Sequence, residues 1–268
     1  MPYAPPALFV AWRAPESHRI FPVGRLLRLV NALPGYEFAY IQGAHAAEEH
    51  GFEPFIAFPQ LARVYRSREL LPFFKNRVLS PSRPDYEQHV ESLTLEAETA
   101  EPMTLLALSG GRRATDLVEV FPDWVEDKRS AVITTRFLVR GVQYIDGAEE
   151  RIQRLQIGDS LRCVADVQNP ANPKALNLQA DDGRFIGFLP DYLVDDVHEI
   201  VGRGGSLDVR VLRVNPPPAP RHHRVLCSLA APGAVAGFRG ETFRPISNEA
   251  SSIDDIVLES SPAVSAAT

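Results

Sequence analysis

The chain has 268 residues, of which 45% are hydrophobic, and it is long enough to bury one large core or two smaller ones. Its net charge of -6 at pH 7 excludes a protein that coats nucleic acid by bulk electrostatics, so any nucleic-acid site must be local. The two cysteines, Cys163 and Cys227, are too few for a disulfide framework or a cysteine-rich zinc module, and we expect both to be reduced thiols.

The sequence predicts a cytoplasmic protein. No segment approaches the roughly 20 consecutive apolar residues that a membrane helix needs. The first residues, MPYAPPALFVAW, lack the basic region and the long apolar stretch of a signal peptide.

Residues 1–128 are predicted to form an α+β domain with a small sheet and several helices. Short apolar or alternating runs predict strands within residues 8–28 and over residues 36–41. Helices are predicted at residues 44–51, from Ser67 to Leu79, from Pro84 to Leu95, and at residues 101–108, where Gly110 and Gly111 follow. The polar segment from Asp123 to Ser130 is the expected domain boundary.

Residues 131–230 are predicted to form a small OB-like β-barrel with one helix. Runs with strand propensity are separated by clusters of Gly, Asn, Asp and Pro, and they cover residues 132–145, 160–167, 175–180, 184–189, 206–214 and 223–229. The helix begins at Pro190 and has one apolar face, made by Leu193, Val197, Ile200 and Val201. Apolar periodicity ends near residue 231, so residues 231–268 are expected to be a flexible tail.

The sequence contains no recognisable catalytic motif. It lacks the P-loop, HExxH, GxSxG and CxxC patterns, so we expect a protein that is not an enzyme and has no cofactor. His222, His223 and Cys227 supply too few ligands for a metal ion, and Cys227 is expected to be a core thiol. Arg112 and Arg113 allow two interpretations, a solvated surface or a phosphate contact.

Four motifs follow one another in the second half. They are FLVRGVQYIDG, RIQRLQIGDSLRC, DVQNPANPKALNL and GRFIGFLPDYLVDDV. In order and spacing these motifs resemble the HIRAN domain across residues 131–215. HIRAN domains are small OB-like barrels found beside remodelling ATPases or alone in bacterial proteins. The resemblance implies binding of single-stranded DNA at its 3′ end and a role in DNA repair.

The resemblance implies a binding patch of five residues. Tyr144 is expected to be an aromatic platform for a base, where stacking is worth roughly 1 to 3 kcal/mol. The family has a basic residue next to this aromatic, where this chain has Gln143, and an acidic residue that meets the 3′ hydroxyl, where this chain has Asn172. Lys174 and Phe188 complete the patch. Ordinary core packing is the alternative role for the two aromatic residues.

The first half resembles the N-terminal subdomain of HipA-type toxin kinases through the segments VGRL, YEFAYI, GFEPFIAFPQL and LLPFFKNRVLSPSR. This resemblance implies an alternative function, an antitoxin-like regulator of a HipA-type kinase, with Phe73, Phe74, Asn76 and Arg77 as partner-binding residues. A helix packed on its own sheet is the other interpretation of these residues. Under either function, a kinase, helicase or nuclease partner would be a separate chain.

Overall fold

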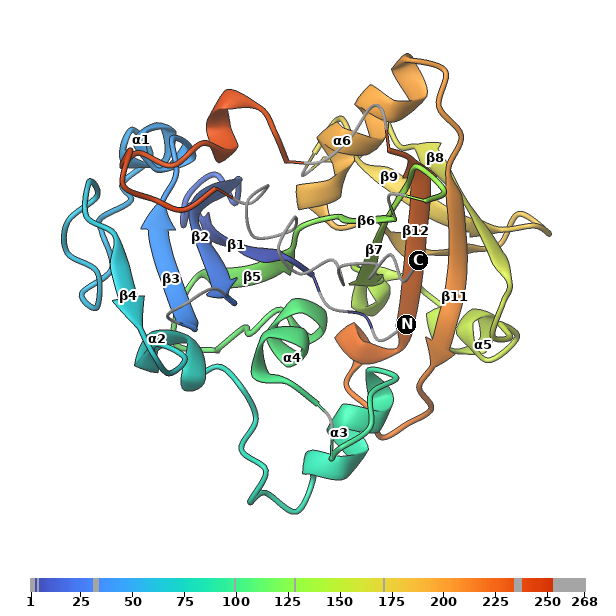
Figure 1. The fold of residues 1–268 in the computed structure, drawn as a ribbon. Coiled ribbons are helices and arrows are strands. Elements are labelled where there is room, and N and C mark those ends of the chain that lie inside the picture. The colour runs from blue at the N-terminus through green and yellow to red at the C-terminus, as the bar shows by residue number, and fades with distance from the viewer. Residues whose placement is uncertain are drawn as a thin grey trace, which may run out of the picture.

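The computed structural model describes residues 3, 5–30, 34–98, 100–127, 129–170, 172–233 and 238–252, and its strands form two antiparallel sheets side by side (Figure 1). The first sheet has the strand order β4-β3-β2-β1-β5, and the second has the order β10-β9-β8-β11-β12-β7-β6. The chain passes from one sheet to the other between β5 and β6, within the predicted boundary. The predicted α+β class is confirmed.

The first half of the chain supplies the first sheet and four helices. The strands are β1 (Ala7–Arg13), β2 (Ile20–Leu29), β3 (Gly35–Tyr40), β4 (Tyr65–Ser67) and β5 (Val118–Pro122), and the helices are α1 (Gly43–Glu48), α2 (Pro72–Lys75), α3 (Tyr86–Ser92) and α4 (Pro102–Ser109). Leu8 and Phe9, adjacent in β1, point to opposite faces and belong to two different core clusters, so both faces of this sheet are buried. As predicted, α4 ends at Gly110, whose φ of 78° favours glycine.

The second half supplies the longer sheet. Its strands are β6 (Val125–Asp127), β7 (Val132–Leu138), β8 (Ser160–Ala165), β9 (Leu176–Ala180), β10 (Phe185–Phe188), β11 (Asp208–Val214) and β12 (Val225–Pro232). The helical elements are α5 (Ala148–Ile152), α6 (Asp191–Gly202) and the 3-10 turns η1 (Val142–Tyr144) and η2 (Arg221–His223), and a third turn, η3 (Glu241–Phe243), follows the sheet. Within the described ranges, no helix has the length and apolar character needed to cross a membrane.

The second sheet curves until its edge strand β10 meets the chain just after β7 at one isolated bridge. The backbones of Arg140, just after β7, and Phe188, in β10, exchange two hydrogen bonds with N–O distances of 2.9 Å. Gly187 permits this approach, because a Cβ atom there would lie 2.4 Å from Cγ1 of Val139. In the part of the chain that is described, no continuous ladder joins these strands, so the predicted OB-like barrel is partly open.

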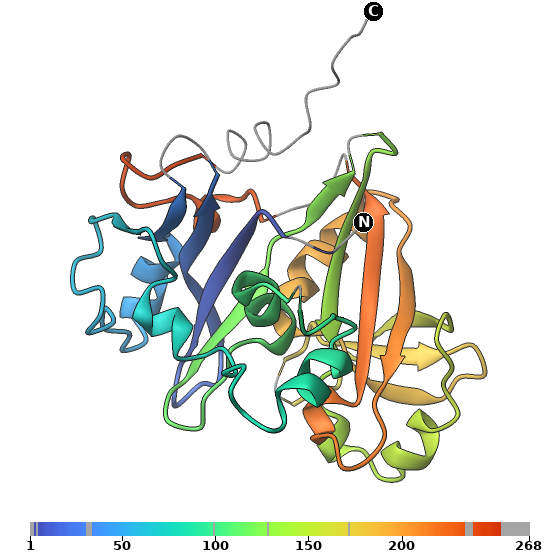
Figure 2. The same ribbon diagram turned by 60° about the horizontal axis from the view of Figure 1, so that its bottom comes forward.

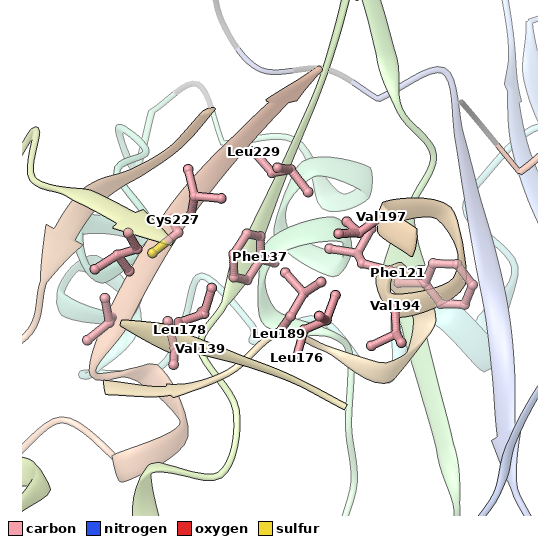
Figure 3. Close-up of a cluster of buried hydrophobic side chains, with 14 of the residues drawn as sticks. Phe121, Phe137, Val139, Leu176, Leu178, Leu189, Val194, Val197, Cys227 and Leu229 are labelled. Carbon is pink, nitrogen blue, oxygen red and sulfur yellow. The ribbon is translucent and has the colours of Figure 1, made fainter. Parts of the chain in front are cut away.

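Two clusters of buried side chains hold the molecule together, and each contains residues from both sheets. The first cluster packs Phe137 of β7 and Val197 of α6 near Phe121 of β5 (Figure 3). In the second cluster, Leu138 and Leu226 pack with the apolar side chains of α4, which lies between the sheets (Figure 2). Each sheet therefore belongs to one of the two predicted domains, but each buried cluster contains side chains from both domains. Independent folding of the two domains stays a prediction.

Residues 238–252 pack against the first sheet, so the prediction of a flexible tail is wrong for this segment. Phe238 is only 3% exposed. The backbone N–H and the hydroxyl of Ser251 donate hydrogen bonds to the buried carboxylate of Glu37 at 2.9 and 2.8 Å. Single aromatic and polar contacts hold the segment, and these leave no periodic pattern in the sequence. The other residues of the predicted tail after residue 233 lie outside the described ranges.

Three local predictions are wrong. The helix expected from Ser67 to Leu79 is limited to the four residues of α2, because Ser67 ends β4 and pairs with β3. The strand expected to continue to Ile145 stops at Leu138, and the chain turns into η1. Val201 in α6 is 54% exposed, because it lies beside the buried face instead of on it.

Candidate nucleic-acid cleft

A cleft of about 1000 Å³ opens between the two halves of the chain. One wall comes from the end of β1 and the loop after α4, and the other from η1, the turn before β9 and the junction of β10 with α6. Ligand-binding clefts in proteins commonly reach this size. Its charged lining residues are Arg13, Arg112, Arg113, Glu119, Arg140 and Asp191.

Tyr144 stands in the wall of this cleft with 82% of its surface exposed. The side chain belongs to η1, which starts after Gly141. Gly141 has a φ of 71°, and a Cβ atom there would lie 2.6 Å from the ring of Phe188, so glycine is required at this turn. The turn thus presents a flat aromatic side chain to solvent, and such a side chain can stack on a base.

Phe188 lines the same cleft but is half-buried. Its ring packs edge-on against Phe185, with 5.0 Å between the centroids and 79° between the planes. Because Phe188 also pairs with Arg140 through its backbone, its position is fixed from two sides. Phe188 therefore has the packing role that the sequence left open, together with a place in the cleft wall.

Asn172 lies in the cleft wall next to the carboxylate of Asp191. The side-chain carbonyl of Asn172 accepts the backbone N–H of Lys174 at 3.0 Å, which closes a local turn. The side-chain amide of Asn172 donates to Oδ1 of Asp191 at 3.2 Å. Asp191 is the exposed first residue of α6. An acid from another element thus stands next to the position where the HIRAN pattern predicted an acid in the turn.

The cleft is basic although the chain as a whole is acidic. Four arginines and two carboxylates line it, an excess of two positive charges. Arg140 forms an ion pair with Glu119 across the two halves. Burial lowers the pKa of Arg13 and that of Arg140, and the neighbouring charge of Arg112 lowers both further. Three guanidinium groups are therefore close enough to influence one another and to raise the local positive potential.

The structure brings together four of the five residues predicted for the patch. Gln143, Tyr144, Asn172 and Phe188 all line the cleft. Lys174 does not line it, and its ammonium group instead forms an ion pair with Asp195 of α6 at 2.8 Å.

Sequence reasoning missed Arg13, Arg140 and Asp191. Arg13 ends β1, Arg140 lies between β7 and η1, and Asp191 begins α6, so the three residues are far apart in the sequence and no single local motif links them. The adjacent pair Arg112 and Arg113 was visible, but nothing in the sequence places it opposite Tyr144.

The residues predicted for the alternative partner surface lie mainly inside the first half. Phe74 is fully buried, and the ring of Phe73 stacks on Phe55 with 4.9 Å between the centroids. Arg77 is buried beneath the loop after α4, with its guanidinium carbon 4.4 Å from the ring centre of Phe73. Asn76 is exposed. These contacts favour a structural role for the group, and its partner-binding role stays a prediction.

The described residues contain no group of three or more His, Cys, Asp or Glu side chains that could hold a metal ion. Cys227 has no exposed surface, which confirms the prediction of a core thiol.

Residues 132–231 match the family model of the HIRAN domain. Two solved structures are similar to part of the chain. One is a protein from Lactobacillus plantarum, with 14% identity, a TM-score of 0.31 and coverage of 40% of this chain and 92% of that chain. The other is the HIRAN domain of human HLTF, with 15% identity, a TM-score of 0.28 and coverage of 38% and 78%. Because both TM-scores are low, the assignment rests on the family model. No curated protein matches the chain.

Proposed function

We propose, from the premise that residues 132–231 are a HIRAN domain, that the chain is a non-catalytic protein that binds the 3′ end of single-stranded DNA in the cleft. HIRAN domains are nucleic-acid-binding modules. The observation that carries the proposal is the exposed ring of Tyr144 in the wall of a basic cleft.

Tyr144 supports a stacking role because its ring is not needed for folding. At 82% exposure the side chain contributes little to the core. A base stacked on an aromatic side chain contributes roughly 1 to 3 kcal/mol to affinity for any base. Stacking on Tyr144 would therefore bind a terminal nucleotide with little sequence preference.

Asp191 supports selectivity for a free 3′ hydroxyl. One of its oxygens accepts the amide of Asn172, and the other has no hydrogen-bond donor among the described residues. A carboxylate that accepts a hydroxyl hydrogen forms a charge-assisted hydrogen bond, worth about 1.5 to 3 kcal/mol. A 3′ phosphate would instead place like charges together, which is unfavourable. The cleft would thus prefer the hydroxyl over the phosphate.

In this proposal any helicase, nuclease or kinase activity belongs to a separate partner chain, and the protein acts in the cytoplasm, in DNA repair. These statements follow from the resemblance and from the lack of catalytic motifs in the sequence.

Fluorescence anisotropy tests the proposal. Labelled oligonucleotides that end in a 3′ hydroxyl, a 3′ phosphate or a closed hairpin would be titrated with wild type, Tyr144→Ala and Asp191→Asn. We expect Tyr144→Ala to weaken binding roughly fivefold to 150-fold for every terminal base, which corresponds to the stacking energy. Asp191→Asn should reduce the preference for the 3′ hydroxyl.

Ile56→Ala is the matched control, because Ile56 is 99% exposed and does not line the cleft. Neither Tyr144→Ala nor Ile56→Ala should change the melting temperature. If wild type binds none of the strands at low salt, or if Tyr144→Ala and Ile56→Ala bind equally well, the proposed function is wrong.

A further inference from the structure

The loop after α4 presents two exposed arginines, Arg112 and Arg113, to the cleft from the first half of the chain. Its backbone is held by Arg77, whose Nη1 donates to the carbonyl of Gly111 at 3.1 Å. Both terminal nitrogens of Arg77 also donate to the carboxylate of Asp116, at 3.1 and 2.6 Å. A buried guanidinium therefore fixes both ends of the loop, while the two arginines between them stay accessible.

The charges of Arg112 and Arg113 are not neutralised within the described residues, where neither has an ion-pair or hydrogen-bond partner. Arg13 lies nearby, and its Nη1 donates a hydrogen bond to the carbonyl of His18 at 3.2 Å. The charge of Arg112 lowers the pKa of Arg13, after the larger effect of burial. Three cationic side chains from the first half thus share one wall of the cleft.

The opposite wall, formed by the second half, has no comparable positive charge among the described residues. Arg140 is paired with Glu119. Burial lowers the pKa of His222, so its imidazole is neutral at pH 7. Lys174 is paired with Asp195 away from the cleft. The domain that carries the stacking platform therefore cannot by itself neutralise the phosphates of a bound strand.

We infer that the first half of the chain completes the nucleic-acid site, with Arg112 and Arg113, supported by Arg13, binding the phosphodiesters that precede the terminal nucleotide. The occupant of this wall is the backbone of a single strand whose last base stacks on Tyr144. This inference rests on the proposed function, since it uses the same cleft. It also assigns to Arg77 a positioning role, because Arg77 holds the loop and does not face the strand.

The salt dependence of binding separates phosphate contacts from other effects. Each phosphate contact on a single strand adds about 0.7 to the slope of log affinity against log salt. Replacing both arginines in Arg112→Ala/Arg113→Ala should therefore lower that slope by about 1.4. If the electrostatic effect vanishes near 1 M salt, the loss of affinity is roughly 70-fold at about 50 mM and roughly tenfold at about 200 mM.

Arg63→Ala/Arg68→Ala is the charge-matched control. It also removes two exposed arginines from the first half, but these flank β4, at the edge of the sheet opposite to β5. The probes are labelled thymidine strands with a free 3′ hydroxyl, a short one of two nucleotides and a longer one of eight. Wild type and control should bind the longer strand more tightly, and the Arg112→Ala/Arg113→Ala variant should lose most of this advantage.

The outcomes distinguish the inference from the proposed function. If wild type binds and the two double variants have the same affinity and salt slope, the inference is overturned while the proposed function stands. If wild type does not bind either strand, the proposed function fails and the inference fails with it. Unchanged melting temperatures would show that both double variants fold, as expected for exposed arginines.

Discussion

Truncation of Phe238 should destabilise the protein strongly, although this residue lies in a segment without periodic apolar residues. The ring is 3% exposed. It packs edge-on against Phe9 and Phe121, with centroid distances of 5.3 and 5.2 Å, and lies 4.8 Å from the centroid of Phe243. Phe238 thus belongs to an aromatic cluster that packs on the first sheet.

The size of the effect follows from the volume that is lost. Phe to Ala changes in cores cost about 3 to 5 kcal/mol, which includes the loss of aromatic contacts such as these. An unfolding entropy of about 2.1 cal/mol/K per residue gives roughly 0.56 kcal/mol/K for 268 residues. We therefore expect Phe238→Ala to lower the melting temperature by roughly 5 to 9 °C.

Thermal and urea unfolding followed by circular dichroism would measure this change. Arg244→Ala is the control in the same segment, because Arg244 pairs with Glu241 only at the surface and such pairs contribute little. If Phe238→Ala has the same melting temperature and urea midpoint as wild type and the control, the packing of residues 238–252 on the first sheet is refuted.

Two other predictions concern stability. Burial raises the pKa of Asp123 and of Asp196 to about 6, so their contribution to stability is fully present below about pH 4 and is lost as the pH rises through about 6. Asp196→Asn should therefore lose less stability than wild type between about pH 4 and about pH 7 in urea titrations, and an equal loss would contradict this. Residues 124–233 expressed alone should melt cooperatively but at a lower temperature than the full chain, because Leu138 and Leu226 lose the α4 side chains that cover them. A melt without cooperativity would contradict the proposed domain division.

The strands of the second half could be predicted because their signals are local. Alternation of side chains and turn residues placed β8, β9, β10, β11 and β12 close to their observed positions. The end of α4 at Gly110 could likewise be predicted, because a glycine commonly follows the last residue of a helix. The prediction of a long helix after Ser67 was wrong, because an apolar run that contains Pro72 is compatible with a short helix packed on an aromatic cluster as well as with a long helix.

The cleft could be predicted only on one side. Tyr144 and Asn172 lie in motifs that resemble those of the HIRAN domain, and this resemblance predicted that wall. The other wall depends on how the loop after α4 packs against the second half, and pairing between distant residues leaves no period or motif. The sequence therefore left Arg112 and Arg113 with two interpretations, a solvated surface or a phosphate contact, and the fold places them beside Arg13 and Arg140.

Photo-crosslinking tests the central claim, that the cleft holds the end of a strand, most directly. A single strand with 4-thiothymidine as its 3′-terminal nucleotide would be irradiated with the full chain, and mass spectrometry would locate the attached residues. The structure predicts crosslinks within residues 141–145 and 185–191, around Tyr144 and Phe188. Crosslinks that map only to other surfaces, such as the β4 edge of the first sheet, would contradict the claim.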